Sequence, residues 1–220
     1  MKRVMAIIAI ALIVSACGPD QPKWAQVGGC DSSSDNTVHE NCTFHSLMSP
    51  RNYKILEGLD FGSAKERVIS INHSTFSRLD MQGADLSGMW LYANDFFGMN
   101  LAKANFREST ISLSNLNMSD FTSANFQGAT FRRSIATAVN LTSANLRGAW
   151  LNGTDFTQAS FVGADLRDSL FSQGTIFGGA DFTDADLTGA TFRPLSLLDE
   201  ESATYCRTTM PDGTLNNRDC

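Results

Sequence analysis

The sequence reads Ala84-Asp85-Leu86-Ser87-Gly88 and returns to this pattern every twenty residues, at Ala104-Asn105-Phe106, Ala124-Asn125-Phe126, Ala144-Asn145-Leu146 and Ala164-Asp165-Leu166. A large apolar residue also recurs at every fifth position from residue 71 to residue 176, except at the weak centre Ala136. A spacing of five matches neither the 3.6-residue period of a helix nor the two-residue period of a strand. The spacing therefore indicates a repeat architecture.

The true repeat is twenty residues long, because the residue two before each apolar centre changes in type with that period. We number the predicted sides of one turn by their first centres: Ile71, Phe76, Met81 and Leu86 open sides one to four, and each side recurs at steps of twenty residues. No single turn buries its own apolar residues, whereas stacked turns do. The sequence thus predicts an all-β solenoid with small residues and apolar centres inside.

The period slips once, near the C-terminal end of the repeat. Ile176 is the expected centre of the second side and Phe177 then points outward, but the next centre, Phe182, comes one residue late. The adjacent glycines Gly178 and Gly179 are typical of a bulge that takes up an extra residue. We therefore predict the insertion at Gly178-Gly179.

The five-residue units resemble the pentapeptide-repeat family, whose consensus is Ala-(Asp/Asn)-Leu-x-x, and the resemblance covers about half of the chain. It implies a right-handed, four-sided (quadrilateral) β-helix. At the ~4.8 Å spacing of stacked strands, about six turns would make a rod roughly 30 Å long. We expect this repeat domain to span residues 71–193.

Residues 1–16 have the features of a secretory signal peptide: Lys2 and Arg3 precede an apolar run that is too short to span a bilayer comfortably. The run ends in Val14-Ser15-Ala16-Cys17, which resembles a bacterial lipobox. The resemblance implies cleavage before Cys17 and acylation of its sulfur and amine, and multiple acyl chains anchor a protein stably. The alternative is an ordinary signal peptide followed by a chance cysteine.

Residue 18 is glycine and not aspartate, which favours the outer membrane by the sorting rule for such lipoproteins. We therefore expect a lipid-anchored protein of the bacterial cell envelope, with its folded part facing the periplasm. The membrane is then the first predicted partner of the chain.

Four cysteines remain after Cys17, an even number that suits disulfide bonds in an oxidising compartment. We predict the local pairs Cys30–Cys42 and Cys206–Cys220. Metal binding is the alternative, but the chain contains no Cys-x-x-Cys pair or Cys/His cluster.

Three flanking segments complete the predicted organisation. Residues 17–50 are polar and form a tether that includes a small disulfide loop, and residues 51–70 form an N-terminal cap over the open end of the coil. Residues 194–220 are similar to the tail that follows the repeats in many pentapeptide-repeat proteins. We expect this tail to form a C-terminal cap that carries the second disulfide.

Charge argues against nucleic acid as a partner. Asp and Glu number 23 against 17 Lys and Arg, a net charge of −6 that becomes more negative when the signal peptide is removed. Some members of the resembled family mimic DNA and bind gyrase, so an inhibitor or decoy of an enzyme or a nucleic-acid-handling protein is the alternative function. Export would separate this chain from such a target.

The outward positions of sides one and two are rich in large apolar residues, which is typical of an interaction face. An unknown protein or a second copy of the chain is the expected partner. The alternative is that residues 51–68 or the C-terminal tail cover the face. Besides Phe177, the candidate residues are Trp90, Tyr92, Phe97, Leu113, Met118, Ile135, Trp150 and Leu170.

Catalytic motifs are missing from the sequence. The three histidines, His39, His45 and His73, belong to no motif, and the regularly placed aspartates alternate with asparagines that suit the same turns. We therefore predict a non-catalytic interaction or structural module without a metal or cofactor.

Overall fold

A computed structural model describes residues 81–172, 174–194 and 202–220, together with the backbone of residues 31–32, 38–40 and 70–72. These residues contain short strands, bridges and turns, and no helix. The strands are β1 (Asp31–Ser32), β2 (Val38–Glu40), β3 (Ser70–Asn72), β4 (Trp90–Tyr92), β5 (Thr110–Ser112), β6 (Thr130–Arg132), β7 (Trp150–Asn152), β8 (Leu170–Ser172), β9 (Thr191–Phe192), β10 (Thr208–Thr209) and β11 (Leu215–Asn216).

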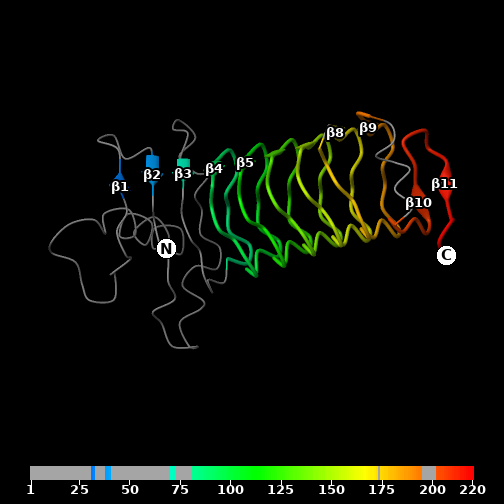
Figure 1. The fold of residues 1–220 in the computed structure, drawn as a ribbon, viewed down its shortest axis with the longest axis horizontal. Helices are drawn as coiled ribbons and strands as arrows, with labels where there is room; N and C mark the ends of the chain where they lie inside the picture. Colours follow the sequence, from blue (N-terminus) through cyan, green and yellow to red (C-terminus); the bar gives the residue numbers. More distant parts are fainter. Residues whose placement is uncertain (1–30, 33–37, 41–69, 73–80, 173, 195–201) are drawn as a thin grey trace, which may run out of the picture.

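One sheet joins β1 to β9 in sequence order and forms the first side of a parallel β-solenoid (Figure 1). From β3 to β7 each strand pairs in parallel with the strand twenty residues later, as Leu91 does with Ile111. The sheet extends further toward the N-terminus than expected. Residues 17–50 are predicted to be a tether, yet β2 pairs in parallel with β3 and β1 pairs antiparallel with β2.

The other sides of each turn pair through isolated parallel bridges. Asp85 bridges Asn105 on the fourth side, and Asp95 bridges Asn115 on the second side. Asn100, on the third side, bridges the residue twenty positions later. With the sheet, these bridges make four lines of pairing per turn, which fits a coil with four sides. Its right-handedness stays a prediction.

The predicted apolar centres form the core. Each of them from Met81 to Phe171 is at most 2% exposed. Consecutive turns place equivalent rings on top of each other, so that Phe106 and Phe126 stack with centroids 4.8 Å apart. The residues two positions before the centres are also buried. Most of them are small, because a larger side chain would overfill the narrow interior.

The predicted site of the insertion is wrong. Ser172 is still twenty residues from its partner Asn152, but Ile176 is twenty-one residues from its partner Asp155. The extra residue therefore lies between Ser172 and Ile176, before Gly178 and Gly179. As a consequence Phe177 is the buried centre, 0% exposed, and Ile176 points outward with 45% exposure.

Gly174 occupies this insertion with a φ of +86°, in the left-handed region that favours glycine. A Cβ at Gly174 would lie 3.3 Å from the Cα of Gly153, so the backbones of the two turns approach closely there. Gly179 has a φ of +69° and sits at an ordinary corner of the coil. Gly179 thus has the conformation of other corner residues, and the glycine pair marks a corner and not the insertion.

Most corners are closed by a hydrogen bond from a backbone N–H to the carbonyl three residues earlier, as from Ala84 to Met81 at 3.0 Å. At the corner between the first and second sides, the hydroxyl groups of Ser114 and Ser134 accept backbone N–H groups instead. The Oγ of Ser114 accepts the N–H of Asn94 at 3.1 Å and donates to the carbonyl of Ser112 at 3.0 Å. Ser134 Oγ in turn accepts the N–H of Ser114 at 3.2 Å. These serines are therefore hydrogen-bonding groups as well as small fillers.

Ser169 offers a test of buried hydroxyls. Its Oγ is buried without a hydrogen-bond partner, and the equivalent position one turn earlier is Ala149. We expect Ser169→Ala to raise the free energy of unfolding by about 1 kcal/mol, because an unsatisfied buried hydroxyl is removed. Ser119→Ala is the matched control and should lower it by about 1 kcal/mol, since Ser119 Oγ donates to the Phe96 carbonyl at 2.5 Å. Urea denaturation measures both, and a loss of stability in Ser169→Ala would contradict the expectation.

The C-terminal tail continues the coil and then closes it. Thr204 bridges Asp181 and Thr209 bridges Asp186, so the tail adds a further layer on the third and fourth sides. β10 and β11 then form an antiparallel pair at the end of the rod (Figure 1). The Tyr205 ring is buried and stacks on the Phe182 ring, with centroids 5.5 Å apart.

Polar contacts hold the tail against the last turns. Arg207 forms a two-point ion pair with the Asp184 carboxylate at 2.6 and 2.7 Å, and this hydrogen bonding holds the pKa of Asp184 below its usual value. A disulfide joins Cys206 to Cys220. The other predicted pair, Cys30–Cys42, lies outside the described residues, as do Cys17 and the segments 1–16 and 51–69.

Candidate interaction face

Apart from Leu215 in β11, the large apolar residues that the structure leaves exposed gather on the first two sides of the coil. On the first side, Trp90 and Tyr92 flank the buried centre of β4, and Trp150 precedes the centre of β7. A strand sends successive side chains to opposite faces, so residues on both sides of a buried centre point outward. We call the exposed apolar set the apolar face: Trp90, Tyr92, Phe97, Leu113, Met118, Ile135, Trp150 and Ile176.

Two of the predicted members belong elsewhere. Phe177 is in the core because of the insertion before it, and its neighbour Ile176 takes the outward position. Leu170 is only half-buried and is a marginal member of the face. The other predicted members are exposed at the positions that the repeat assigns to them.

Leu113 and Met118 stand at corners with φ values of +52° and +58°. A left-handed backbone disfavours any residue with a Cβ by roughly 1–2 kcal/mol, and many other corners of this coil carry glycine. The chain thus holds two bulky apolar side chains on corners where glycine would relieve strain. Other non-glycine corner residues, such as Lys103 and Ser123, have the same conformation, so it is a property of the corners of this coil and does not by itself mark a site.

A groove of about 510 Å³ crosses the first side between Trp90 and Trp150. We call it the Trp90–Trp150 groove. The two indoles stand three turns apart along β4, β5, β6 and β7, which is about 14 Å at the spacing of stacked strands. Short side chains lie between them, so the indoles form the two ends. The groove is lined by Trp90, Leu91, Tyr92, Thr110, Ser112, Leu113, Thr130, Arg132, Arg133 and Trp150.

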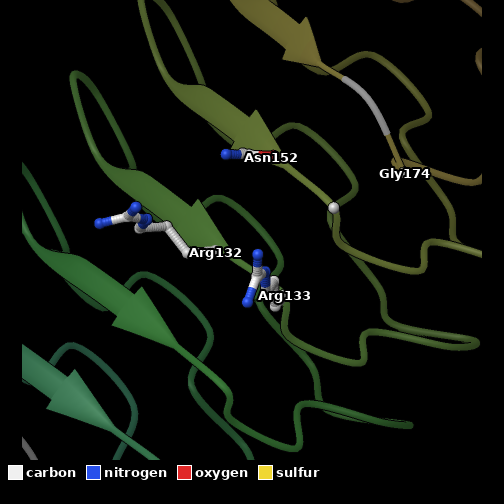
Figure 2. Close-up of a pocket in the computed structure, with 5 residues that line it drawn as sticks. Arg132, Arg133, Asn152 and Gly174 are labelled. Atoms are coloured by element: carbon white, nitrogen blue, oxygen red, sulfur yellow. The ribbon is translucent and has the colours of Figure 1, made fainter.

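A second hollow of about 440 Å³ adjoins the groove and shares Arg132 and Arg133 with it. Figure 2 shows Arg132 and Asn152 on neighbouring strands, with Arg133 at the corner that follows Arg132 and Gly174 on a later turn. Gly153 and Gly174 line this hollow and have no side chains to fill it. The two hollows together make a continuous polar and aromatic depression on the first side.

The described tail does not cover the groove. Residues 202–220 pair with Asp181 and Asp186 on the third and fourth sides, and Trp90 and Trp150 remain 59% and 44% exposed. The other predicted cover, residues 51–68, lies outside the part of the chain that the structure describes. Among the described residues, the face is therefore open.

The groove offers binding chemistry and no catalytic set. Its hydroxyls are on Tyr92, Thr110, Ser112 and Thr130, and the described lining residues include no histidine, aspartate or glutamate. The described residues also contain no group of three His, Cys, Asp or Glu side chains that could hold a metal. Of the three histidines only the backbone of His39 is described.

Sequence reasoning found the aromatic residues of the groove but missed its arginines as part of the same site. Arg132 lies forty residues after Tyr92 in the chain and Arg133 follows it, and the stacking of turns brings all three to one side. The signal was present in the repeat, because residues twenty positions apart occupy equivalent places in successive turns.

Comparison with known proteins gives a family match within the coil. The family model for pentapeptide repeats matches residues 95–135, 137–173 and 173–193, in eight copies. No curated protein matches the sequence. The family match covers the turns that carry most of the apolar face.

Solved structures with pentapeptide repeats are similar to this chain. A trypsin-treated variant of QnrB1, a plasmid-mediated fluoroquinolone resistance protein, is 26% identical with a TM-score of 0.44, over 64% of this chain and 72% of that one. HetL, involved in heterocyst differentiation regulation in the cyanobacterium Nostoc sp. strain PCC 7120, is 20% identical with a TM-score of 0.26, over 73% and 86%. A protein of the Arabidopsis thaliana thylakoid lumen is 29% identical with a TM-score of 0.25, over 50% and 63%.

Proposed function

We propose that this chain, whose residues 95–193 match the pentapeptide repeat family, is a non-catalytic scaffold that binds a protein partner through its apolar face. The proposal includes a lipid anchor at Cys17 and a place at the bacterial cell envelope. The coil supplies a rigid rod, and the exposed side chains on its first two sides supply the contact surface.

One observation carries this function: large apolar and aromatic side chains are exposed together on two adjoining sides of the coil. Single exposed apolar residues are common on soluble proteins, but a continuous patch marks a site of interaction. Tryptophan and tyrosine are also the residues that contribute most to binding at protein interfaces. Trp90, Tyr92 and Trp150 are therefore the expected anchors of the partner.

The third and fourth sides contrast with this face. Their outward positions hold mostly polar side chains, among them Arg107, Arg147 and Arg167, each of which forms an ion pair with a neighbouring acid. Exposed pairs of this kind contribute little to stability and keep a surface solvated. The asymmetry between the sides supports a rod with one binding face.

The anchor supports a role at a membrane surface. Among the described residues no helix is long and apolar enough to cross a membrane. Acylation of Cys17 would hold the rod at the outer membrane, facing the periplasm, through more than one acyl chain. Cys17→Ser should then move the protein from the membrane fraction to the soluble fraction, and unchanged partitioning would contradict the anchor.

Site-specific photo-crosslinking in cells tests the face itself. A photo-reactive residue in place of Trp150, and separately in place of Leu113, is expected to give adducts of higher mass whose partner mass spectrometry identifies. Arg107 and Ser143 are matched controls, because both are exposed on the polar sides and Ser143 shares the corner conformation of Leu113. Crosslinks confined to the chain itself, or equal adducts at the control positions, would contradict the proposal.

A further inference from the structure

The Trp90–Trp150 groove has a charge opposite to that of the chain. The whole protein carries a net charge of −6, yet the described residues that line the groove and the hollow beside it include no aspartate or glutamate. Two arginines, Arg132 and Arg133, do line both. A local cationic site on an acidic protein points to an anionic ligand.

These arginines also differ from others on the coil in having no internal partner. The guanidinium groups of Arg132 and Arg133 form no ion pair or hydrogen bond with the residues that the structure describes. By contrast, Arg147 pairs with Asp168 at 3.1 Å and Arg167 pairs with Asp165 at 2.6 Å. The groove therefore presents two guanidinium groups whose donors are available to a ligand.

The surroundings of the arginines are held in place by the coil. Arg132 ends β6, and Arg133 follows at a corner with a φ of +49°, so two consecutive side chains leave the backbone from a fixed bend. The Trp150 indole N–H donates to Ser172 Oγ on the next turn at 3.4 Å, which orients the ring at one end of the groove. A site that is ordered before binding loses less entropy when a ligand arrives.

We infer that the Trp90–Trp150 groove binds an extended acidic peptide segment of a partner protein. Its carboxylates pair with Arg132 and Arg133, and its apolar side chains pack on Trp90 and Trp150. Guanidinium groups bind carboxylates through two parallel hydrogen bonds, and indole faces supply the apolar contact. This inference rests on the proposed function, since it names the chemistry of the partner at the same face.

The dimensions of the groove suit a peptide. An extended chain advances about 3.3 Å per residue, so four residues span the ~14 Å between the two indoles. Side chains at positions i, i+2 and i+4 share one face of such a chain. Apolar residues at i and i+4 can therefore contact Trp90 and Trp150 while an acidic residue at i+2 lies over Thr110 and Thr130, from where its carboxylate is approached by the long side chains of Arg132 and Arg133.

Three other occupants fit less well. A membrane surface calls for a cluster of about four to eight Lys and Arg, and the groove has two. A nucleic acid would meet an acidic protein over the rest of its contact surface. A second copy, joined by a twofold axis through this face, would bring the same two arginines and no groove carboxylate.

Selection from a displayed library of random nine-residue peptides tests the inference, with the full chain as bait. The wild-type protein is expected to enrich peptides that carry Asp or Glu between two apolar residues. The tightest peptide and its Glu→Gln counterpart are then titrated by fluorescence anisotropy. We expect roughly tenfold weaker binding for the Glu→Gln peptide and for the R132Q/R133Q protein, because each loses charge-assisted hydrogen bonds.

The R107Q/R147Q protein is the matched control, since it removes the same charge from the fourth side, and its affinity should stay within about twofold of the wild type. R132K/R133K keeps the charge but not the two-point geometry and should bind with intermediate affinity. Thermal melts by circular dichroism check that each variant folds. All four arginines are exposed at the surface, so no loss of core packing is expected.

Other outcomes would overturn the inference. The selection could enrich peptides without acidic residues that bind the R132Q/R133Q protein but not the W90A/W150A protein. That result would contradict an acidic ligand, although the apolar face would still bind a partner. Arginine-dependent binding to phosphatidylglycerol vesicles, without peptide enrichment, would replace the peptide with a membrane surface. If no peptide requires the two tryptophans or the two arginines for binding, the inference is wrong. The proposed function is tested separately by the crosslinking adducts.

Discussion

Phe177→Ala is expected to lower the free energy of unfolding by about 3–5 kcal/mol, the usual range for loss of a buried phenylalanine. Phe177 is fully buried, and its ring packs against Phe156, Phe171 and Phe182 with centroid distances of 6.0, 5.2 and 5.4 Å. No neighbouring side chain is free to fill the space, because the adjacent rings are held by their own stacks. The variant therefore leaves a cavity in the middle of the last turns.

Ile176→Ala is the matched control for this prediction. Ile176 is adjacent in the chain but 45% exposed, so its truncation should change stability by less than about 0.5 kcal/mol. Urea denaturation of both variants, followed by circular dichroism, measures the difference. If Ile176→Ala proves to be the damaging change, the extra residue lies after Phe177 and the register of the last turns is different from the one described.

Tyr205→Ala is expected to open the C-terminal end of the rod, at a loss of about 3–5 kcal/mol. The Tyr205 ring is 2% exposed and extends the ladder of third-side centres by stacking on Phe182. Its other face lies under the Arg218 guanidinium, 5.0 Å from the ring centroid. Without the ring, Phe182 loses its cover, and the end of a solenoid cannot leave its core exposed to water.

The position of the damage is a further part of this prediction. Repeats interact with their nearest neighbours, so amide hydrogen exchange should rise in residues 181–192 and stay slow around residues 110–130. Leu215→Ala is the control, because Leu215 lies in β11 but is 60% exposed. Equal effects of Tyr205→Ala and Leu215→Ala, or uniform exchange along the rod, would show that the tail does not cap the coil.

The regular part of the coil could be predicted from the sequence because its period has a single physical explanation. Each turn must bury one centre per side, so an apolar residue every fifth position identifies the interior. The insertion could not be placed in the same way. Ile176 and Phe177 are both large and apolar, and either satisfies the period, so only the pairing of Asp155 with Ile176 decides between them.

The sequence also could not predict which buried hydroxyl groups form hydrogen bonds. Ser114 and Ser169 occupy equivalent small positions before two different centres, yet Ser114 Oγ takes part in the corner and Ser169 Oγ has no partner. The backbone turn bond does not decide this, because Ser119 Oγ is paired at a corner that has the turn bond, whereas Thr154 Oγ1 is unpaired at a corner that lacks it. A pattern of small residues records size and does not record which backbone groups remain unpaired.

The sequence predicted one part of the candidate site, and only the tertiary structure placed the other part. By itself, the sequence determined a solenoid with alternating inward and outward positions, and hence the exposure of Trp90, Tyr92 and Trp150, because period and burial are properties of successive residues. Only the tertiary structure decided that Arg132 and Arg133 share a groove with Trp90 and Trp150, and that the described lining residues of this groove include no acid. Stacking turns converts a separation of twenty residues into one strand spacing, so the neighbours of a side chain depend on the register of the whole coil.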